Sequence, residues 1–432
     1  MVKDGKLSSA ASTVTITAYN IVPAAVAGPT QYVFVGPQVT LDGSNSSDGN
    51  GDPLTYSWSF ILKPQSSAAT LSNPNTASPF FTPDVTGAYR LSLTVNDGTA
   101  NSQTSTVTVY VATAPASAAQ WRVPADFPTI QAAIDVASPG NIISVAPGTY
   151  VGNLRFNGKA VTLQSTAGPS RTIIEGSNDT AVDIGPDGAI IGFTIRKGVA
   201  SFGAGMAING TGTLIKQNIF ESNAQGGGGY GAAIGGNSAS PTIDSNIFYN
   251  NTCDNQFLSG VISFVNSSSP VIINNVIENN PCRAINMTLP EGNTPQVTNN
   301  TIVSNQGGIH VDCRVSTAQH IYRNNLIVGN DIGLEIIFGT ETDNPTWQNN
   351  LVFGNGVNYS GTTDKTNVSG NISSDPMFVD QTGDFYFLMA GSPAIDHGTN
   401  TGAPTFDFIG RSRPIDGNGD GSAVTDIGAF EY

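Results

Sequence analysis

An asparagine followed by a short, mostly apolar run recurs along the second half of the chain. The recurring residues are Asn218, Asn246, Asn275, Asn300, Asn325 and Asn350. The steps between them are 28, 29, 25, 25 and 25 residues. A second asparagine follows each one five residues later, at Asn223, Asn251, Asn280, Asn305, Asn330 and Asn355. A fixed period of this size predicts a solenoid.

The apolar runs between these asparagines predict strands rather than helices. Each run has three or four residues and lacks a 3.6-residue period. Asparagine tolerates the left-handed backbone that tight corners need. Successive coils would lie about 4.8 Å apart, so equivalent side-chain amides could hydrogen-bond along a ladder. The pattern therefore predicts an all-β, parallel β-helix with structural asparagines.

An amphipathic helix is expected where this domain begins. Ile130, Ala133, Ile134 and Ala137 follow helical spacing over residues 128–137, and Pro128 suits the first turn. Such a helix would cover the open end of the first coil, which otherwise exposes a sheet edge.

Residues 20–114 show a different pattern, in which short alternating strands such as 54–60 and 89–95 are separated by Gly, Pro, Asn and Asp. This predicts an antiparallel β-sandwich. Segments 2–5 and 12–16 resemble segments 95–98 and 105–109 at a constant offset of 93 residues. We therefore expect residues 1–19 to be the remnant of a preceding sandwich, and the sequence to be a fragment of a longer chain.

The sandwich segment resembles the PKD family, which is immunoglobulin-like. The resemblance rests on four motifs: Ala27-Gly28-Pro29, Leu41-Asp42-Gly43-Ser44, Tyr56-Ser57-Trp58-Ser59-Phe60 and Leu93-Thr94-Val95-Asn96-Asp97-Gly98. Domains of this family usually serve as spacers or as weak carbohydrate or protein binders on secreted proteins.

Residues 120–432 resemble secreted bacterial right-handed parallel β-helix proteins of the pectate-lyase-like kind. Segments 129–134 and 145–150 match the beginning of such domains, whereas 375–380, 391–396 and 426–431 match their C-terminal cap. The resemblance implies a secreted or cell-surface location and a polysaccharide or cell-surface glycan as partner. It is specific for the fold and poor for the activity.

Charge and cysteine content narrow the classes of partner. The net charge is −15, which argues against nucleic acid. No run of about 18 apolar residues is present, so no membrane span is expected, and we expect a monomer. Cys253 and Cys282 each follow a ladder asparagine by two residues, which would bring their Cα atoms within disulfide range. A disulfide and two stacked free thiols both remain open, and Cys313 has no evident partner.

Alignment of the coils on the asparagines places Ser263, Asn286, His310 and Glu335 in register. The alternation over 308–312 turns Ile309 and Val311 inward, and it turns His310 and Asp312 outward.

Cationic residues near this face complete a candidate site. Arg283 and Arg314 are expected there, with Ser263, Asn286 and Arg283 as substrate-binding residues and His310, Asp312, Arg314 and Glu335 as catalytic candidates. A lyase would use His310 or an arginine as the base, and Arg283, Arg314 or Ca²⁺ to neutralise a uronate carboxylate. A hydrolase would use Asp312 and Glu335 as paired carboxylates. The third interpretation is that these are ordinary solvated residues.

A Gly-rich acidic loop near the C-terminus predicts bound Ca²⁺. Asp416, Asn418 and Asp420 alternate like the first half of an EF-hand loop, with Asp426 as a further ligand. Ile427 stands where an EF-hand has its glutamate, so we expect Ca²⁺ to stabilise the cap and to have no catalytic role. A similar run at Asp48, Asn50 and Asp52 could bind Ca²⁺ in the sandwich.

Two classes of function fit this sequence. The first is a carbohydrate-binding or carbohydrate-processing protein, possibly a polysaccharide lyase or glycoside hydrolase. The second is a non-catalytic adhesin or extracellular-matrix protein. The fold alone does not separate them.

Overall fold

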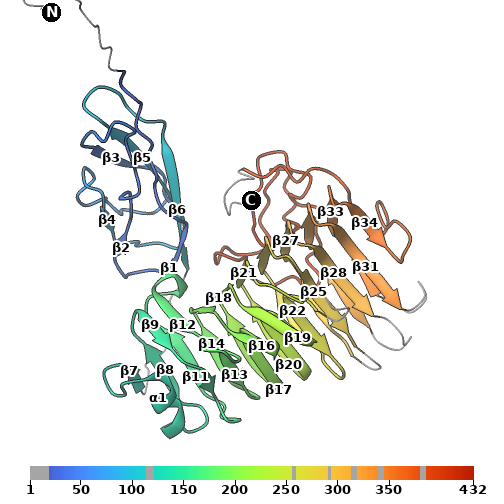
Figure 1. The fold of residues 1–432 in the computed structure, drawn as a ribbon. Helices are drawn as coiled ribbons and strands as arrows, with labels where there is room; N and C mark the ends of the chain where they lie inside the picture. The colour runs from blue at the N-terminus through green and yellow to red at the C-terminus, as the bar shows by residue number, and fades with distance from the viewer. Residues whose placement is uncertain are drawn as a thin grey trace, which may run out of the picture.

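The computed structural model describes residues 19–112, 121–254, 259–289, 293–312, 319–338, 345–379 and 386–432. It consists almost entirely of β-strands, arranged as a small sandwich followed by a long solenoid (Figure 1). The two-part all-β fold expected from the sequence is confirmed. The expected remnant over residues 1–19 lies, except for its last residue, outside the described ranges.

The sandwich has a four-stranded sheet in the order β1-β6-β5-β3 and a two-stranded sheet of β2 and β4. Strands β3, β5 and β6 pair antiparallel as expected, whereas β1 pairs parallel to β6. Trp58 is buried in the core between the sheets. The strands are β1 Gln31–Phe34, β2 Val39–Thr40, β3 Thr55–Leu62, β4 Phe80–Phe81, β5 Gly87–Asn96 and β6 Ser105–Ala112.

The solenoid stacks parallel strands into three faces. One face is a nine-stranded sheet within the described residues. Its strands are β9 Gly148–Val151, β12 Thr172–Glu175, β15 Thr194–Arg196, β18 Ile219–Glu221, β21 Ile247–Tyr249, β24 Val276–Glu278, β27 Thr301–Val303, β30 Leu326–Val328 and β33 Leu351–Phe353.

The other two faces form one continuous sheet because β17 and β20 are long enough to span both. One face contains β7 Trp121–Val123, β8 Ile142–Val145, β11 Thr162–Ser165, β14 Ala189–Ile191, β17 Met206–Lys216, β20 Ile234–Asp244, β23 Val271–Ile273, β26 Gln296–Thr298, β29 His320–Arg323 and β32 Pro345–Gln348. The other adds β10 Leu154–Arg155, β13 Val182–Ile184, β22 Ile262–Val265, β25 Arg283–Thr288, β28 Gly307–Asp312, β31 Ile332–Phe338 and β34 Val357–Ser360. A side pair is formed by β16 Val199–Phe202 and β19 Ala224–Tyr230.

The first coils are covered by the helix that the sequence predicts, α1 Ile130–Val136, and a short 3₁₀ turn, η1 Pro169–Arg171, lies nearer the sandwich. The Thr129 hydroxyl caps α1 by accepting a hydrogen bond from the Ala132 amide. Ile130, Ala133 and Ile134 point into the core at the first coil. Among the described residues, no helix is both long enough and apolar enough to cross a bilayer.

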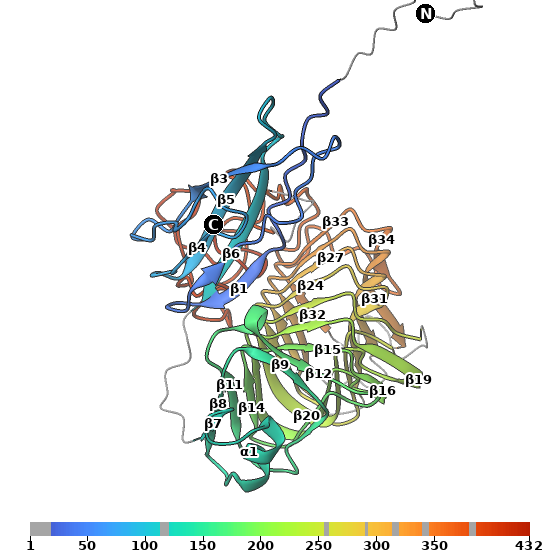
Figure 2. The same cartoon turned by 60° about the vertical axis from the view of Figure 1, so that its left-hand side comes forward.

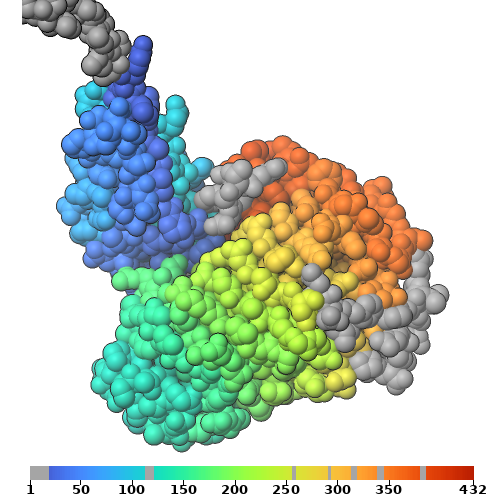
Figure 3. All heavy atoms as spheres, in the orientation of Figure 1, coloured from blue at the N-terminus to red at the C-terminus, as the bar shows by residue number. Residues whose placement is uncertain are grey.

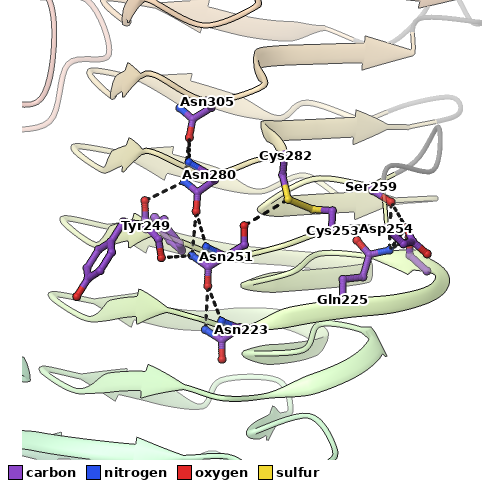
Figure 4. Close-up of a disulfide and its surroundings, with 12 residues drawn as sticks. Asn223, Gln225, Tyr249, Asn251, Cys253, Asp254, Ser259, Asn280, Cys282 and Asn305 are labelled. Carbon is purple, nitrogen blue, oxygen red and sulfur yellow. Dashed lines mark hydrogen bonds between the residues drawn. A yellow bond between two sulfur atoms is a disulfide. The ribbon is translucent and has the colours of Figure 1, made fainter.

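Two asparagine ladders run along the solenoid as predicted. At a typical rung, Asn300 Oδ1 accepts from the backbone and side-chain amides of Asn275, at 2.9 and 3.0 Å. Its own Nδ2 donates to the carbonyl of Ile272 and to Asn325 Oδ1. Figure 4 shows part of the second ladder. Each buried amide thus satisfies backbone groups that the corners leave unpaired.

The left-handed residue at each corner is the one before the ladder asparagine, and this corrects the sequence interpretation. Asn274, Asn299, Asn324 and Asn349 have φ between 51° and 57°. The ladder asparagines are instead selected for side-chain bonding inside the coil, whereas their neighbours bear the turn.

Irregular segments close the far end of the solenoid and form a cap. The cap buries Arg413 beside Glu431, with Nη1 and Oε1 3.3 Å apart. Asp407 and Asp426 are buried in the same region. Burial raises the pKa of Asp426 to about 6 and that of Glu431 to about 7, whereas Arg413 opposes both shifts.

The sandwich rests on the solenoid and on this cap (Figures 2 and 3). The Tyr32 amide donates to the Ser170 hydroxyl at 2.6 Å, and the Tyr32 ring stacks on Tyr110. Tyr110 in turn contacts Phe387 of the cap. Phe34 is fully buried, and its ring lies against Gly192, where a Cβ would approach within 2.7 Å. The sandwich is therefore docked, unlike the spacer that the family resemblance implies.

Candidate functional site

Four neighbouring strands bring the predicted polar residues into one row. Ser263 of β22 pairs with Asn286 of β25, Asn286 pairs with His310 of β28, and His310 pairs with Glu335 of β31. This is the register that the 25-residue repeat predicts. Ile309 and Val311 belong to the core, as the alternation requires.

His310, Glu335 and Arg283 form one bonded group. His310 Nδ1 lies 2.9 Å from Glu335 Oε2. Arg283 Nε lies 3.5 Å from the same oxygen, although Arg283 is two coils away from Glu335. The arginine reaches this far because it crosses Gly307, where a Cβ would approach Arg283 Cγ within 3.1 Å. A glycine between the two coils is therefore a requirement of the group.

The protonation states of the pair follow from burial and bonding. Burial is the main cause that lowers the pKa of His310, and Glu335 partly opposes it. The hydrogen bond from His310 lowers the pKa of Glu335, and Arg283 adds to this effect. At neutral pH the group therefore contains a neutral imidazole, a carboxylate and a guanidinium.

These three residues line a cavity of about 220 Å³. Gln306 and Asp331 also line it and were missed from the sequence. Each directly follows a ladder asparagine, Asn305 or Asn330. The corner position after the second asparagine was the signal that would have identified them.

The expectation that His310 and Asp312 are open to solvent is wrong. Their residues are 1% and 2% exposed, although both lie on the outer side of the strand. Glu335 and Arg283 retain more exposure, at 18% and 26% of their side chains. The cavity is thus reached at Glu335 and Arg283 rather than at the imidazole.

The remaining candidates lie apart from this cavity. Ser263 and Asn286 are fully buried and do not line it, and neither does Asp312. Arg314 and Cys313 lie outside the described residues. The structure therefore brings together three of the seven predicted catalytic and substrate-binding residues.

The predicted calcium ligands do not converge. Asp416 accepts hydrogen bonds from the amides of Gly419 and Gly421, and Asn418 accepts one from Asp420. Asp426 is buried and bonded to the amides of Asp396 and Tyr432. In the described ranges, no three His, Cys, Asp or Glu residues are grouped as a metal site. Bound Ca²⁺ stays a prediction for the Asp416–Asp420 loop, and Asp426 is not part of that loop's geometry.

Cys253 and Cys282 form a disulfide between adjacent coils, with Cα atoms 5.7 Å apart (Figure 4). The Cys282 sulfur also lies 3.4 Å from the carbonyl oxygen of Asn251, a ladder residue. The bond therefore links two coils at the position that the ladder register indicates.

Comparison with known proteins matches each domain separately. The KIAA0319-like PKD domain family matches residues 27–111, and the family described as right-handed β-helix region matches residues 161–319. The dyslexia-associated protein KIAA0319 homolog of Mus musculus is 43% identical over 109 residues, which are 25% of this chain and 10% of that protein. Its Homo sapiens counterpart is 41% identical over 90 residues, which are 21% of this chain and 8% of that protein.

The matched part therefore spans about a tenth of the length of these curated relatives. Among solved structures, pectin methylesterase from carrot is 12% identical and has a TM-score of 0.33. That match covers 60% of this chain and 90% of the carrot protein. The two family matches, the docked sandwich and the laddered solenoid agree, so the chain is a PKD-domain, right-handed β-helix protein.

Proposed function

We propose that this protein is an extracellular or cell-surface protein that binds a hydroxyl-rich polysaccharide at the pocket of Arg283, His310 and Glu335. The observation that carries the proposal is the bonded group itself, which lines a cavity on the outer side of the solenoid. Such a pocket offers a cationic donor and a carboxylate acceptor at fixed positions, as sugar hydroxyls require.

The extracellular location is supported by the cross-coil disulfide between Cys253 and Cys282. Disulfides persist in oxidising compartments and are rare in reducing ones. The PKD-like domain supports the same location through the family resemblance.

The charge of the pocket favours an uncharged sugar over a uronate. Arg283 is already paired with Glu335, and Asp331 adds a second carboxylate to the lining. With His310 neutral, the lining carries one positive and two negative charges. An anionic sugar would therefore meet net repulsion.

Cleavage is the second candidate, and the neutral imidazole of His310 is the observation that favours it. A neutral imidazole hydrogen-bonded to a carboxylate can act as a base in a β-elimination. Two features oppose cleavage. His310 is buried, and the pKa of Glu335 is lowered, so this carboxyl group is a poor general acid for hydrolysis.

Binding is tested by titrating the protein with soluble neutral polysaccharides and with polygalacturonate. We expect Arg283→Gln and Glu335→Gln to weaken binding of the neutral polymer about tenfold, the effect of about 1.4 kcal/mol in lost charged hydrogen bonds. Arg155→Gln is the matched control, because Arg155 also pairs with an acid of the next coil, Asp179, but lies outside the pocket. Equal affinity of all three variants and the parent would refute the proposal.

Cleavage is tested separately by incubating the same polymers and following unsaturated products and new reducing ends. If the protein is an elimination enzyme, His310→Ala should abolish product formation while Arg155→Gln retains it. Binding without any product would leave the non-catalytic interpretation as the correct one.

A further inference from the structure

A larger cleft lies between the sandwich and the nine-stranded sheet. Its volume is about 620 Å³, within the usual range for ligand sites. Thr30, Gln31 and Asp42 line it from the sandwich, and Glu221, Tyr249 and Glu278 line it from the solenoid. Figure 1 shows this angle between β1 and the strands β18 and β21. None of these residues belongs to the His310 pocket.

The solenoid wall presents one side chain per coil. Arg196 pairs in register with Glu221, Glu221 with Tyr249, and Tyr249 with Glu278. Because adjacent coils lie about 4.8 Å apart, the cleft runs along the solenoid axis with a repeated spacing. An extended chain of similar units fits such a wall better than a compact ligand does.

The wall is held in place by bonds from three parts of the molecule. The Tyr249 hydroxyl donates to Glu221, which fixes the orientation of the ring. At the far side, the Tyr386 hydroxyl of the cap donates to Glu278 at 2.5 Å. The sandwich supplies the opposite wall through its docking at Tyr32 and Ser170. A preorganised cleft of this kind lowers the entropy cost of binding.

The chemistry of the walls defines the ligand class. A tyrosine ring offers an apolar face on which a sugar ring can lie, and carboxylates and amides accept and donate hydrogen bonds to hydroxyls. Arg196 is bonded to Glu175 and Glu221, at 3.0 and 3.2 Å. Asp42, Glu221 and Glu278 therefore outweigh the only cation of this wall in the described residues, which disfavours acidic sugars.

We infer that the cleft between the two domains is a second saccharide site, which binds a neutral or amino-bearing oligosaccharide along the solenoid axis. This goes beyond the proposed pocket function, because it gives the sandwich a role as one wall of a binding site. It also requires both domains in one chain.

The test is calorimetric titration of the full chain with cellohexaose, chitosan hexaose and hexagalacturonate. We expect either or both of the first two to bind, and the third to bind at least tenfold more weakly. Tyr249→Ala should weaken binding about tenfold by removing the ring. Tyr230→Ala is the matched control, because Tyr230 lies on the side pair β16–β19 outside the cleft.

A second variant, Thr30→Trp, fills the cleft from the sandwich side without altering a coil. It should lose binding by tenfold or more, which keeps the test decisive if Tyr249→Ala unfolds. Failure of both neutral and amino-bearing probes to bind would overturn the inference, as would tightest binding of hexagalacturonate. Loss caused by Arg283→Gln but by neither cleft variant would assign the binding to the pocket and would also overturn it.

Discussion

The asparagine ladders and the C-terminal cap bury polar groups in opposite ways. In the ladders, neutral amides repeat once per coil, and each bonds to its neighbours above and below. In the cap, Arg413 and three acids are buried once, in an irregular segment. The ladder distributes its cost over many equal rungs, whereas the cap depends on a single cation.

This difference separates two kinds of stability. A neutral amide has no proton to gain or lose, so the ladders should be insensitive to pH. The cap contains carboxyl groups whose pKa values are raised by burial, so its stability should vary with pH.

The largest effect should follow removal of the only cation in this cap cluster among the described residues. Arg413→Met leaves Glu431 and its neighbours buried without their counter-charge, and it should cost about 3–5 kcal/mol. The measurement is urea unfolding, with limited proteolysis near residue 413. Arg411→Met is the control, because Arg411 bonds a backbone carbonyl of Glu431 and not a carboxylate. A loss no greater than in this control would show that the cluster does not depend on Arg413.

A break in the middle of a ladder should come next. Asn300→Ala leaves the buried Ile272 carbonyl and Asn275 amide without partners, and it should cost about 2–4 kcal/mol. Asn355→Ala, near the end of the second ladder and only partly buried, should cost about 1 kcal/mol. Unfolding free energies of the two variants test this order. Equal losses would mean that rungs do not act through their neighbours.

The smallest effect should be the pH dependence of the cap. The pKa of Glu431 is raised to about 7 and that of Asp426 to about 6. The folded state therefore binds more protons than the unfolded state over this interval. The stability from these groups is complete below about pH 4 and is lost as the pH rises to about 7, by about 1–3 kcal/mol.

Denaturation at pH 5 and pH 8 measures this slope. Glu431→Gln should flatten it, whereas Asn355→Ala should leave it unchanged. A slope that survives in Glu431→Gln would assign the pH dependence to other groups.

The sequence was sufficient for features that repeat. The pairing of His310 with Glu335 could be predicted because the constant 25-residue step between asparagines determines which residues lie side by side. The same register placed Cys253 beside Cys282. Local periodicity carries this information because each coil bonds only to its neighbours.

Other features depend on contacts that have no period. The burial of His310 depends on how its surroundings pack over the strand, which its own alternation does not determine. Asp426 was taken for a metal ligand because it follows an acidic loop, but its carboxylate bonds the amide of Asp396, thirty residues away. The docking of Tyr32 against Phe408 joins segments from opposite ends of the chain, and no local pattern announces such a contact.

The aromatic contacts between sandwich and cap also give the molecule a mechanical property. Tyr110 and Phe387 contact each other although the whole solenoid lies between them in sequence. Tension applied between the two domains would load this clasp before it reached the hydrogen bonds between coils. The solenoid is therefore shielded from stretching until the clasp opens, much as a closed buckle protects the strap behind it.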